Sequence, residues 1–476
     1  MKLKKLFPAL IAALFALSPL SACVRERYAF GDYIVPEYQD NVRIHIGAWG
    51  GGITYLKDGS GKPNPQWFKD LTDAGFNLIH PMWWDSVDFG GRSSLSLQRS
   101  LDVMNIAAEY GVDVLVNDTN LARTHINDPV GKIGWDPSNV GWYKDHKAFF
   151  GLAIIDEPTY QEFEIYIKEK HEKFLETFGA DTDKWFFVNL RSSGGGLAYM
   201  GTPTFKGYCD GYLSITGANV LSTDNYVLQA DNTVRTNFFS DIEVSRKAAK
   251  KYGVPLNNFI LSIPHKFGLG DYKDPTENEL LWQTTVNLAY GLESFMYYTY
   301  APPDDPGAKY GNGLVTISGE KLAKWHYAKT INSRLLQWDH VYMNFARGWE
   351  RTFGIPAAHG GIHSLFSQLQ NIYDPALDTI DGIKSISCDN EVLLGEFYDK
   401  DGNQGFMLTN ATIPFQGKTA SVTIKFDNAG RNGYQGVQLY ENGLPRIVDL
   451  NAGGELVVTL DPGDGKFMIP LRKAVL

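Results

Sequence analysis

Two adjacent carboxylates follow an apolar run near the first third of the chain. The segment FFGLAIIDEPTYQEF, residues 149–163, places Asp156 and Glu157 directly after seven mostly apolar residues and before Pro158. A partly buried carboxyl group with a second carboxylate beside it has a raised pKa and can act as a general acid. The pair therefore predicts acid/base chemistry at the end of a strand. The alternatives are that Glu157 caps the next helix or pairs with an arginine, and that Asp156 only accepts a supporting hydrogen bond.

The elements that must position this pair follow a regular repeat of strand-like and helix-like runs. The strand-like runs begin near Arg43, Phe76, Val112, Phe149, Lys184, Asn219, Asn257 and Ser294, at intervals of 33 to 38 residues. Most of the intervening segments hold a helical pattern that ends at a glycine. Eight such units predict a (β/α)8 TIM barrel over residues 42–345. An open doubly wound sheet is less suitable, because the run GAWGGG lacks the spacing of a dinucleotide-binding fingerprint.

The chain changes character after the eighth helix-like segment. Residues 346–383 form a less regular join. From 384 to 476, short alternating runs separated by KDG, NAG and ENG turns predict a C-terminal all-β sandwich. Its aromatic residues are expected to be core or interface residues, so the sandwich is predicted to support the barrel and not to bind the main ligand. The aromatic residues in question are Phe397, Phe406, Tyr434 and Tyr440.

Polar and aromatic residues recur at the predicted carboxyl ends of the strands, which form the active-site face of such a barrel. Flat aromatic rings suit the C–H face of a pyranose, and Asp and Asn side chains suit its hydroxyl groups. Each aromatic taken alone is more often a core residue, but together these residues predict a carbohydrate-binding site. They are Trp49, Trp83, Trp84, Asp85, Asn117, Asp118, Asp224, Asn225, Tyr226, His265, Tyr298 and Tyr300.

The first 23 residues, MKLKKLFPALIAALFALSPLSAC, have a basic start, an apolar centre and small residues before Cys23. This pattern predicts a bacterial secretory signal, and LSAC resembles a lipobox. We therefore expect Cys23 to be lipidated and residues 24–41 to act as a spacer. The mature protein would then be secreted and anchored to the bacterial outer membrane by lipid alone. An ordinary signal peptide cleaved nearby is the alternative.

Charge and cysteine content restrict the partners. The formal net charge is −10, which argues against nucleic acid or another anionic polymer and favours a neutral carbohydrate. Besides Cys23, the only cysteines are Cys209 and Cys388. Two cysteines so far apart in the sequence make neither a disulfide framework nor a zinc site. The first strand carries His45 without a second histidine two residues later. No metal and no cofactor are therefore predicted.

Several segments together resemble the secreted glycoside hydrolase-like lipoproteins of Bacteroidetes, which are distantly similar to clan A glycosidases. In the barrel these segments are HKAFFGLAIIDEP, NVLSTDNY, NFILSIPH and LLWQTTVNLAYGLESFMYYTY, and in the sandwich VLLGEFYDKDG. The resemblance implies that Glu157, at the end of the fourth strand, is the general acid/base, with Asp156 at the place of the usual asparagine. The seventh strand departs from the pattern, since LSIPHKFG offers His265 where the family has a nucleophilic glutamate.

The missing strand-seven carboxylate leaves three function classes. The first is a glycoside hydrolase with Glu157 as acid and Asp224 as the preferred second carboxylate, ahead of Asp118 and Asp85. Because Asp224 is expected two strands away from Glu157, a gap that holds a water, and hence inversion, is expected. The second class is a glycan-binding lipoprotein on a degenerate barrel. The third, a metal-dependent hydrolase, lacks a recognisable ligand set.

Overall fold

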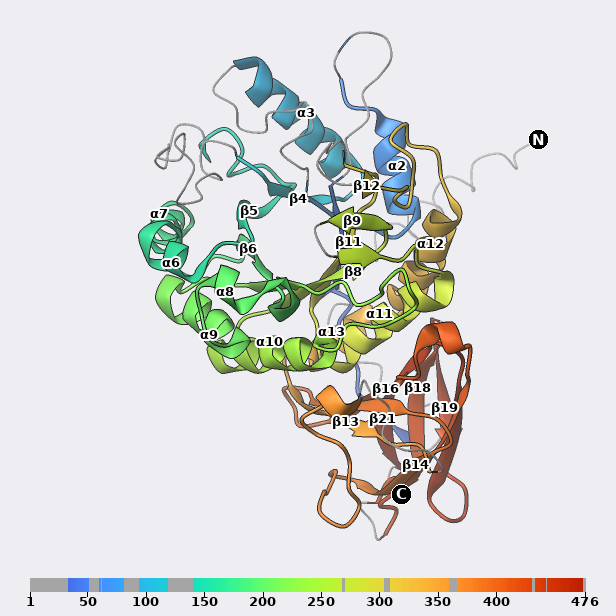
Figure 1. Ribbon diagram of the computed structural model, residues 1–476. Helices are drawn as coiled ribbons and strands as arrows, with labels where there is room; N and C mark the ends of the chain where they lie inside the picture. The colour runs from blue at the N-terminus through green and yellow to red at the C-terminus, as the bar shows by residue number, and fades with distance from the viewer. Residues whose placement is uncertain are drawn as a thin grey trace, which may run out of the picture.

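The computed structural model comprises a barrel surrounded by helices and, beside it, a C-terminal β-sandwich (Figure 1). It describes residues 33–50, 60, 62–80, 94–118, 140–267, 270–303, 309–358, 366–429, 433–441 and 443–473. Within these ranges, no helix has both the length and the apolar composition needed to cross a membrane.

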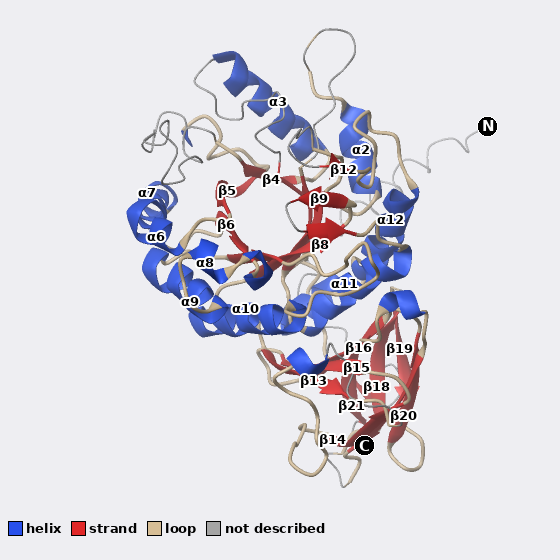
Figure 2. Ribbon diagram, viewed as in Figure 1, coloured by secondary structure: helices blue, strands red, loops and turns tan. Residues whose placement is uncertain are grey.

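Eight parallel strands close the barrel in the order β11-β2-β3-β4-β5-β6-β7-β8, seen as the central ring of strands in Figure 2. Each begins within two residues of its predicted start, so the predicted (β/α)8 architecture is confirmed. The strands are β2 (His45–Trp49), β3 (Leu78–His80), β4 (Asp113–Val116), β5 (Phe149–Asp156), β6 (Trp185–Arg191), β7 (Leu221–Asp224), β8 (Leu256–Leu261) and β11 (Ser294–Tyr298).

The barrel interior is a packed core, because alternate residues of each strand point toward its axis. Trp185 and Phe187 fill it from β6, and Phe259 and Met296 fill it from β8 and β11. Gly151 on β5 allows the backbone to approach closely, since a Cβ there would lie 2.2 Å from the carbonyl oxygen of Trp185. By the same alternation, Asn189 and Arg191 on β6 share the inward direction of Trp185 and Phe187.

The helices form the outer layer of the barrel (Figure 2). Helix α10 has Asp241 in its first turn and Lys250 and Lys251 in its last, as the helix dipole favours, and it ends at Gly253 in the left-handed conformation. The helices of this layer are α2 (Pro65–Asp73), α3 (Ser94–Glu109), α6 (Tyr160–Glu162), the π-helix η1 (Phe163–Ile167), α7 (Lys168–Phe178), α9 (Phe205–Thr216), α10 (Phe238–Tyr252), α11 (Glu277–Ala289), α12 (Ala323–Leu335) and α13 (Asp339–Ala346). Two short helices, η2 (Ser193–Gly195) and α8 (Leu197–Met200), belong to the connection that follows β6.

Three short strands follow β8 and β11 along the chain and make a small antiparallel sheet of their own. They are β9 (His265–Phe267), β10 (Gly270–Tyr272) and β12 (Lys309–Tyr310), in the order β10-β9-β12. In Figure 1 β9 is drawn over the barrel ring. The sheet carries three aromatic rings, those of His265, Tyr272 and Tyr310, to one place.

The C-terminal domain consists of two antiparallel sheets with an apolar core between them, which confirms the predicted sandwich. One sheet has the order β13-β15-β16-β21-β18-β19, with β1 (Tyr33–Ile34) paired to β21, and the other has the order β14-β17-β20. The segment 346–383, expected as an irregular join, thus includes the first strand of the sandwich. The strands are β13 (Trp349–Ile355), β14 (Ile383–Cys388), β15 (Val392–Tyr398), β16 (Gln404–Asn410), β17 (Ala420–Phe426), β18 (Gly436–Glu441), β19 (Leu444–Asp449), β20 (Glu455–Leu460) and β21 (Gly465–Lys473), and two short helices are η3 (Phe366–Gln368) and η4 (Pro414–Gln416).

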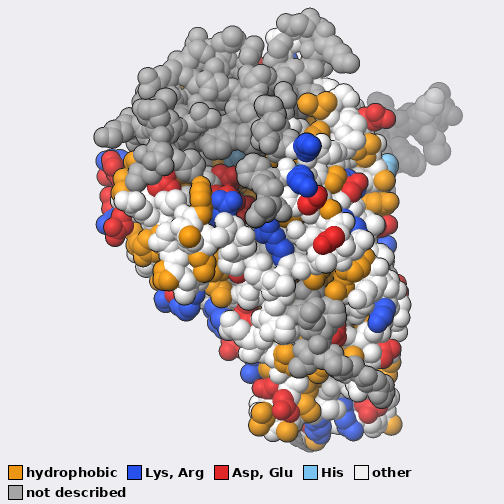
Figure 3. Space-filling view, in the orientation of Figure 1, with side chains coloured by type: hydrophobic (Ala, Val, Ile, Leu, Met, Phe, Trp, Pro, Cys, Tyr) orange, Lys and Arg blue, Asp and Glu red, His pale blue; other side chains and the backbone are white. Residues whose placement is uncertain are grey.

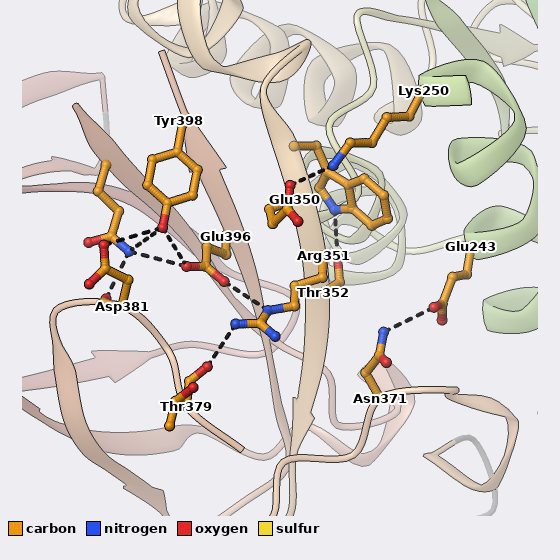
Figure 4. A network of polar contacts seen from close by, with 12 residues as sticks. Glu243, Lys250, Glu350, Arg351, Thr352, Asn371, Thr379, Asp381, Glu396 and Tyr398 are labelled. Carbon is orange, nitrogen blue, oxygen red and sulfur yellow. Dashed lines mark hydrogen bonds and ion pairs between the residues drawn. The ribbon is translucent and has the colours of Figure 1, made fainter. Parts of the chain in front are cut away.

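Apolar packing and polar contacts join the two domains. The ring of Phe467, on β21, is fully buried. Its centroid lies 6.0 Å from that of Trp338, the residue before α13, and 5.2 Å from that of Phe345, within α13. Figure 4 shows the polar part, in which Lys250 of α10 pairs with Glu350 of β13 at 2.6 Å. Beside it Asn371 donates to Glu243 of α10 at 3.1 Å. The sandwich therefore lies against the outer helices of the barrel.

Candidate active site

Glu157 stands at a strained position immediately after β5. Its φ is 48°, in the left-handed region, which costs a residue other than glycine about 1–3 kcal/mol. Its N–H donates to the carbonyl of Asn189 at 2.8 Å, which extends the β5–β6 pairing by one residue. The following helix is capped by Thr159 and Glu162, whose side chains form a capping box, so Glu157 is not needed as a cap. Strain of this kind is retained where the side-chain direction matters.

The side chain of Glu157 meets Asp224, the last residue of β7. The hydrogen bond between the two carboxyl groups raises the pKa of Glu157 and lowers that of Asp224, so it favours the proton on Glu157. Burial, followed by the charges of Asp224 and Asp156, raises the pKa of Glu157 well above its ordinary value. Arg191 opposes this shift, since its Nη1 lies 3.4 Å from Glu157 Oε2. The predicted pairing with an arginine thus exists alongside the acid/base arrangement.

Asp224 is 8% exposed, and burial raises its pKa as well. Hydrogen bonds from Asn189, Glu157 and the backbone of Ser192, and the charge of Arg191, act in the opposite direction. More donors face Asp224 than Glu157, so these surroundings favour the proton on Glu157. The direct contact between the carboxyls also corrects the expected separation, because no water-sized gap lies between them.

Asp156 is held by a row of hydrogen bonds that crosses five barrel strands. Asn189 Nδ2 donates to Asp156 Oδ1 at 2.9 Å, and Ser222 donates to Asn189 Oδ1 at 3.2 Å. Asn257 then donates to Ser222 at 2.9 Å, and Ser294 donates to Asn257 at 2.8 Å. The row joins residues that are direct neighbours in the strand register, so it follows from the pairing of the barrel. It orients Asn189 and keeps Asp156 as an acceptor.

An aromatic cluster lies beside the carboxyl groups. Tyr226 is 5.0 Å from Tyr298 between ring centroids and 5.7 Å from His265. His265 stacks on Tyr272 at 4.4 Å, and Tyr298 and Tyr310 share a hydrogen bond of 2.8 Å between their hydroxyls. The charges of Asp224 and Asp156 raise the pKa of both Tyr226 and Tyr298, although burial is the larger cause for each. The four tyrosines of this cluster, Tyr226, Tyr272, Tyr298 and Tyr310, are each half-buried.

A small cavity of about 20 Å³ reaches into the barrel next to Asp156. It is lined in part by Trp49, His80 and Asn117. Trp49 is 6% exposed and stacks on His80 at 3.9 Å, so one of its faces is already covered. Burial lowers the pKa of His80 to about 3, which keeps this imidazole neutral. The cavity has room for about one water molecule.

Three residues predicted to bind the ligand are directed into packing instead. Asp118 is fully buried and accepts a hydrogen bond of 2.8 Å from Tyr143. Asn225 donates a hydrogen bond of 3.3 Å to Asp241 of α10, so its side chain is directed toward the outer helices. Tyr300 is 1% exposed and packs at 5.1 Å on Trp67 of α2. Trp83, Trp84, Asp85 and Cys23 lie outside the described residues.

Several residues at the site were not anticipated from the sequence. Asn189 and Arg191 end β6, and alternation from Trp185 and Phe187 would have placed them inside the barrel. The others, Tyr199, Arg235, Tyr272 and Tyr310, come from connections with no periodic signal. Tyr199 is 51% exposed and its ring lies 4.5 Å from the guanidinium carbon of Arg191. Within the described ranges, no group of three or more His, Cys, Asp or Glu residues is arranged to hold a metal ion.

No family model matches the chain, and no curated protein matches it by sequence. Among solved structures, it is similar to a proposed alpha-galactosidase from Bacteroides fragilis, with 10% identity over 93% of this chain and 81% of that one and a TM-score of 0.49. It is similar to the beta-galactosidase of the psychrophilic Marinomonas ef1, with 9% identity over 63% of this chain and a TM-score of 0.46, and spans 62% of the length of that enzyme. It is also similar to a glycoside hydrolase family 30 subfamily 8 xylanase from Clostridium acetobutylicum, with 11% identity over 90% of this chain and 97% of that one and a TM-score of 0.43. Because these TM-scores are below 0.5, we infer the function from the site and not from the matches.

Proposed function

We propose that the protein is a glycoside hydrolase that cleaves the O-glycosidic bond of an oligo- or polysaccharide at the carboxyl end of its barrel. One observation carries the proposal: Glu157, whose pKa is raised well above its ordinary value, is hydrogen-bonded to Asp224 beside a group of tyrosine rings. A carboxyl group with a raised pKa and a second carboxyl group near it are the two residue types that most glycoside hydrolases use. The tyrosine rings supply the flat surface on which a pyranose binds.

In this mechanism Glu157 is the general acid. A glycosidic oxygen that enters the site replaces the Asp224 oxygen as the acceptor of the Glu157 proton. As the bond between this oxygen and the anomeric carbon breaks, the proton moves to the leaving oxygen, and Glu157 becomes a carboxylate. Arg191, 3.4 Å from Glu157 Oε2, stabilises the negative charge that Glu157 then carries.

Asp224, released from its bond to Glu157, accepts the proton of the attacking water or stabilises the positive charge on the sugar ring. Asp156 remains an acceptor held by Asn189 and adds a second negative charge near the developing oxocarbenium ion. Water supplies the hydroxyl that ends on the anomeric carbon, so the reaction needs no cofactor.

The alternative proposal is a glycan-binding protein that uses the same aromatic rings without cleavage. Two observations favour it. The end of β8 leads to Ser262 and, on β9, to His265, so it brings no carboxylate to the site. The hydrogen bond between Glu157 and Asp224 also brings the two carboxyl groups together, whereas two-carboxylate glycosidases keep theirs apart on either side of the scissile bond.

Incubation of the wild-type protein with a broad oligosaccharide panel separates the two. The hydrolase proposal expects reducing ends to appear from at least one glycan, and it expects Asp224→Asn to abolish their release. Lys266→Gln, a change at an exposed residue of the neighbouring strand β9, is the matched control and should leave the rate within a factor of about two. Binding without any cleavage across the panel would instead establish the glycan-binding alternative.

A further inference from the structure

We propose that the glycan bound at this site carries an anionic substituent, either a carboxylate or a sulfate ester, and that Arg235 binds it. This inference rests on the proposed function and adds a substrate class to it. It also departs from the neutral ligand that the net charge of the chain favours, because a net charge describes the whole chain and not the local arrangement of cations.

Arg235 lies in the connection between β7 and α10 and is held rigidly beside the aromatic cluster. Its Nη2 donates a hydrogen bond to the hydroxyl of Tyr272, and its Nη1 donates to Ser192 Oγ at 3.4 Å. Its guanidinium carbon lies 5.1 Å from the centroid of the Tyr272 ring. Both contacts are to neutral groups, so they orient the guanidinium without neutralising its charge.

The remaining donors of Arg235 have no carboxylate partner among the described residues. A guanidinium has five N–H donors, and the two contacts above use two of them. Arg43, Arg191, Arg347, Arg351 and Arg446 each form an ion pair with Asp or Glu. Within the part of the chain that the structure describes, Arg235 forms none, and neither does the buried Arg246, which donates to the carbonyl of Ala346 instead. A half-buried guanidinium with free donors is suited to bidentate binding of a planar or tetrahedral oxyanion.

Asp241, in the first turn of α10, is an acidic side chain whose pKa Arg235 affects. Arg235 lowers the pKa of Asp241, while burial, the larger cause, raises this pKa to about 6. Its Oδ2 already accepts hydrogen bonds from Asn237 Nδ2 at 2.6 Å and from the N–H of Ser193 at 2.9 Å. The carboxylate of Asp241 therefore binds the loop that follows β6 and does not form an ion pair with Arg235.

That loop is shaped to hold two guanidinium groups. Residues 192–196 read SSGGG. A Cβ on Gly194 would lie 2.9 Å from Arg235 Nη1, and a Cβ on Gly195 would lie 2.1 Å from Arg191 Nε. The two glycines leave the space that the guanidinium groups occupy, so the loop presents Arg191 and Arg235 along one edge of the site.

The two arginines and the two reacting carboxyls surround the same ring. The charges of Asp224 and Glu157 raise the pKa of Tyr272, and those of Arg235 and Arg191 lower it, with burial as the largest cause of its raised value. The face of the molecule drawn in Figure 3 carries both basic and acidic side chains. An anionic substituent would be repelled by Asp156 and Asp224 and attracted by Arg235, which fixes the orientation of the sugar relative to Glu157.

Isothermal titration calorimetry in a Glu157→Gln background tests this, because turnover is then suppressed. The probes are tetrasaccharides of polygalacturonate and of a sulfated galactan, each measured beside its carboxyl-reduced or desulfated form. We expect at least one anionic probe to bind about 10- to 100-fold more tightly than its neutral form, as hydrogen bonds to charged groups allow. Which pair shows the preference identifies the substituent as a carboxylate or a sulfate ester.

Adding Arg235→Gln should abolish this preference and leave the affinity for the neutral form within a factor of about two, which also verifies that the variant is folded. Adding Lys266→Gln, the loss of an exposed cation on β9 that is already paired with Asp271 at 3.1 Å, should leave the preference intact. Equal binding of the charged and neutral forms, absence of binding by both anionic probes, or a preference that survives Arg235→Gln would overturn the proposal. Cleavage of neutral glycans alone would refute the anionic-substituent proposal and leave the hydrolase proposal standing. Binding of an anionic probe without cleavage of any glycan would support the anionic-substituent proposal and refute the hydrolase proposal.

Discussion

Asn189 Nδ2 lies 2.9 Å from Asp156 Oδ1, and hydrogen bonding to Asn189 lowers the pKa of Asp224. One inward-facing side chain of β6 therefore supports both carboxylates that accompany Glu157. Its own orientation is fixed by Ser222, which donates to Asn189 Oδ1 at 3.2 Å. The ionisation of the site thus depends on a buried amide that would not itself contact the reacting bond.

Asn189→Ala should destabilise the protein and move the acidic limb of the pH–rate profile to higher pH. The variant leaves the buried acceptors of Asp156 and Asp224 without their donor, which should lower the free energy of unfolding by about 1–3 kcal/mol. Because the bond from Asn189 lowers the pKa of Asp224, its loss should raise the pH at which Asp224 becomes a competent base. Urea denaturation and the pH dependence of kcat/KM measure the two effects.

Asn219→Ala is the control for this variant. Asn219 Oδ1 accepts the N–H of Phe186 at 3.0 Å, and its Nδ2 donates to the Lys184 carbonyl at 2.7 Å, before the start of β7. It should cost stability without shifting the pH profile. If both variants have the wild-type profile, the proposed role of Asn189 is wrong.

Glu157→Gln should gain thermal stability relative to the wild type as the pH rises. Folding raises the pKa of Glu157 above its ordinary value of 4.5. At a pH between these two pKa values, Glu157 is protonated in the native protein and ionised in the unfolded chain. Wild-type stability is therefore greatest below the unfolded pKa and declines as pH increases through the folded pKa. Gln does not titrate, so the difference in Tm, variant minus wild type, should increase over this window. A difference that is independent of pH would show that the pKa of Glu157 is not raised.

Phe467→Ala should weaken the attachment of the sandwich to the barrel. The ring is fully buried between Trp338 and Phe345, so its truncation should lower the free energy of unfolding by about 3–5 kcal/mol. Phe415→Ala, at a ring that is 36% exposed, should have a much smaller effect. A chain that ends near residue 345 should accordingly be poorly soluble, and an equally stable and active barrel alone would contradict the supporting role of the sandwich.

Cys23→Ser tests the lipid anchor that the sequence predicts. If Cys23 is the lipidated first residue of the mature chain, the variant should move from the membrane fraction to the soluble fraction in a bacterial host. Fractionation followed by immunoblotting measures the distribution. Retention of the variant on the membrane would show that the LSAC motif is not a lipobox.

The barrel was predictable because its signal is distributed along the whole chain. Each β/α unit repeats after 33 to 38 residues, so an error in one unit does not disturb the next. The carboxyl ends of parallel strands share one face, which explains why Glu157, Asp224, Tyr226 and Tyr298 come together as expected. Asn225, just beyond the end of β7, instead donates to Asp241 of α10 and does not join this group.

The remaining site residues could not be predicted by the same means. Arg235, Tyr272 and Tyr310 lie in connections or short strands, whose paths depend on tertiary packing and not on a repeat. Tyr300 lies beyond the end of β11 at Tyr298, where strand alternation no longer indicates a direction. The direct contact of Glu157 with Asp224 depends on the left-handed backbone of Glu157, which no sequence pattern indicates for a glutamate before a proline.

The most direct test of the account compares Glu157→Gln with the wild type on two glycosides of the same sugar, one with an alkyl leaving group and one with a dinitrophenyl leaving group. If Glu157 is the general acid, kcat/KM for the alkyl glycoside should fall by about 10²- to 10⁴-fold, because its leaving oxygen needs the proton. The dinitrophenyl glycoside needs little protonation, so its rate should fall far less. An equal loss on both substrates, or no loss on either, would contradict the assignment of Glu157 as the acid.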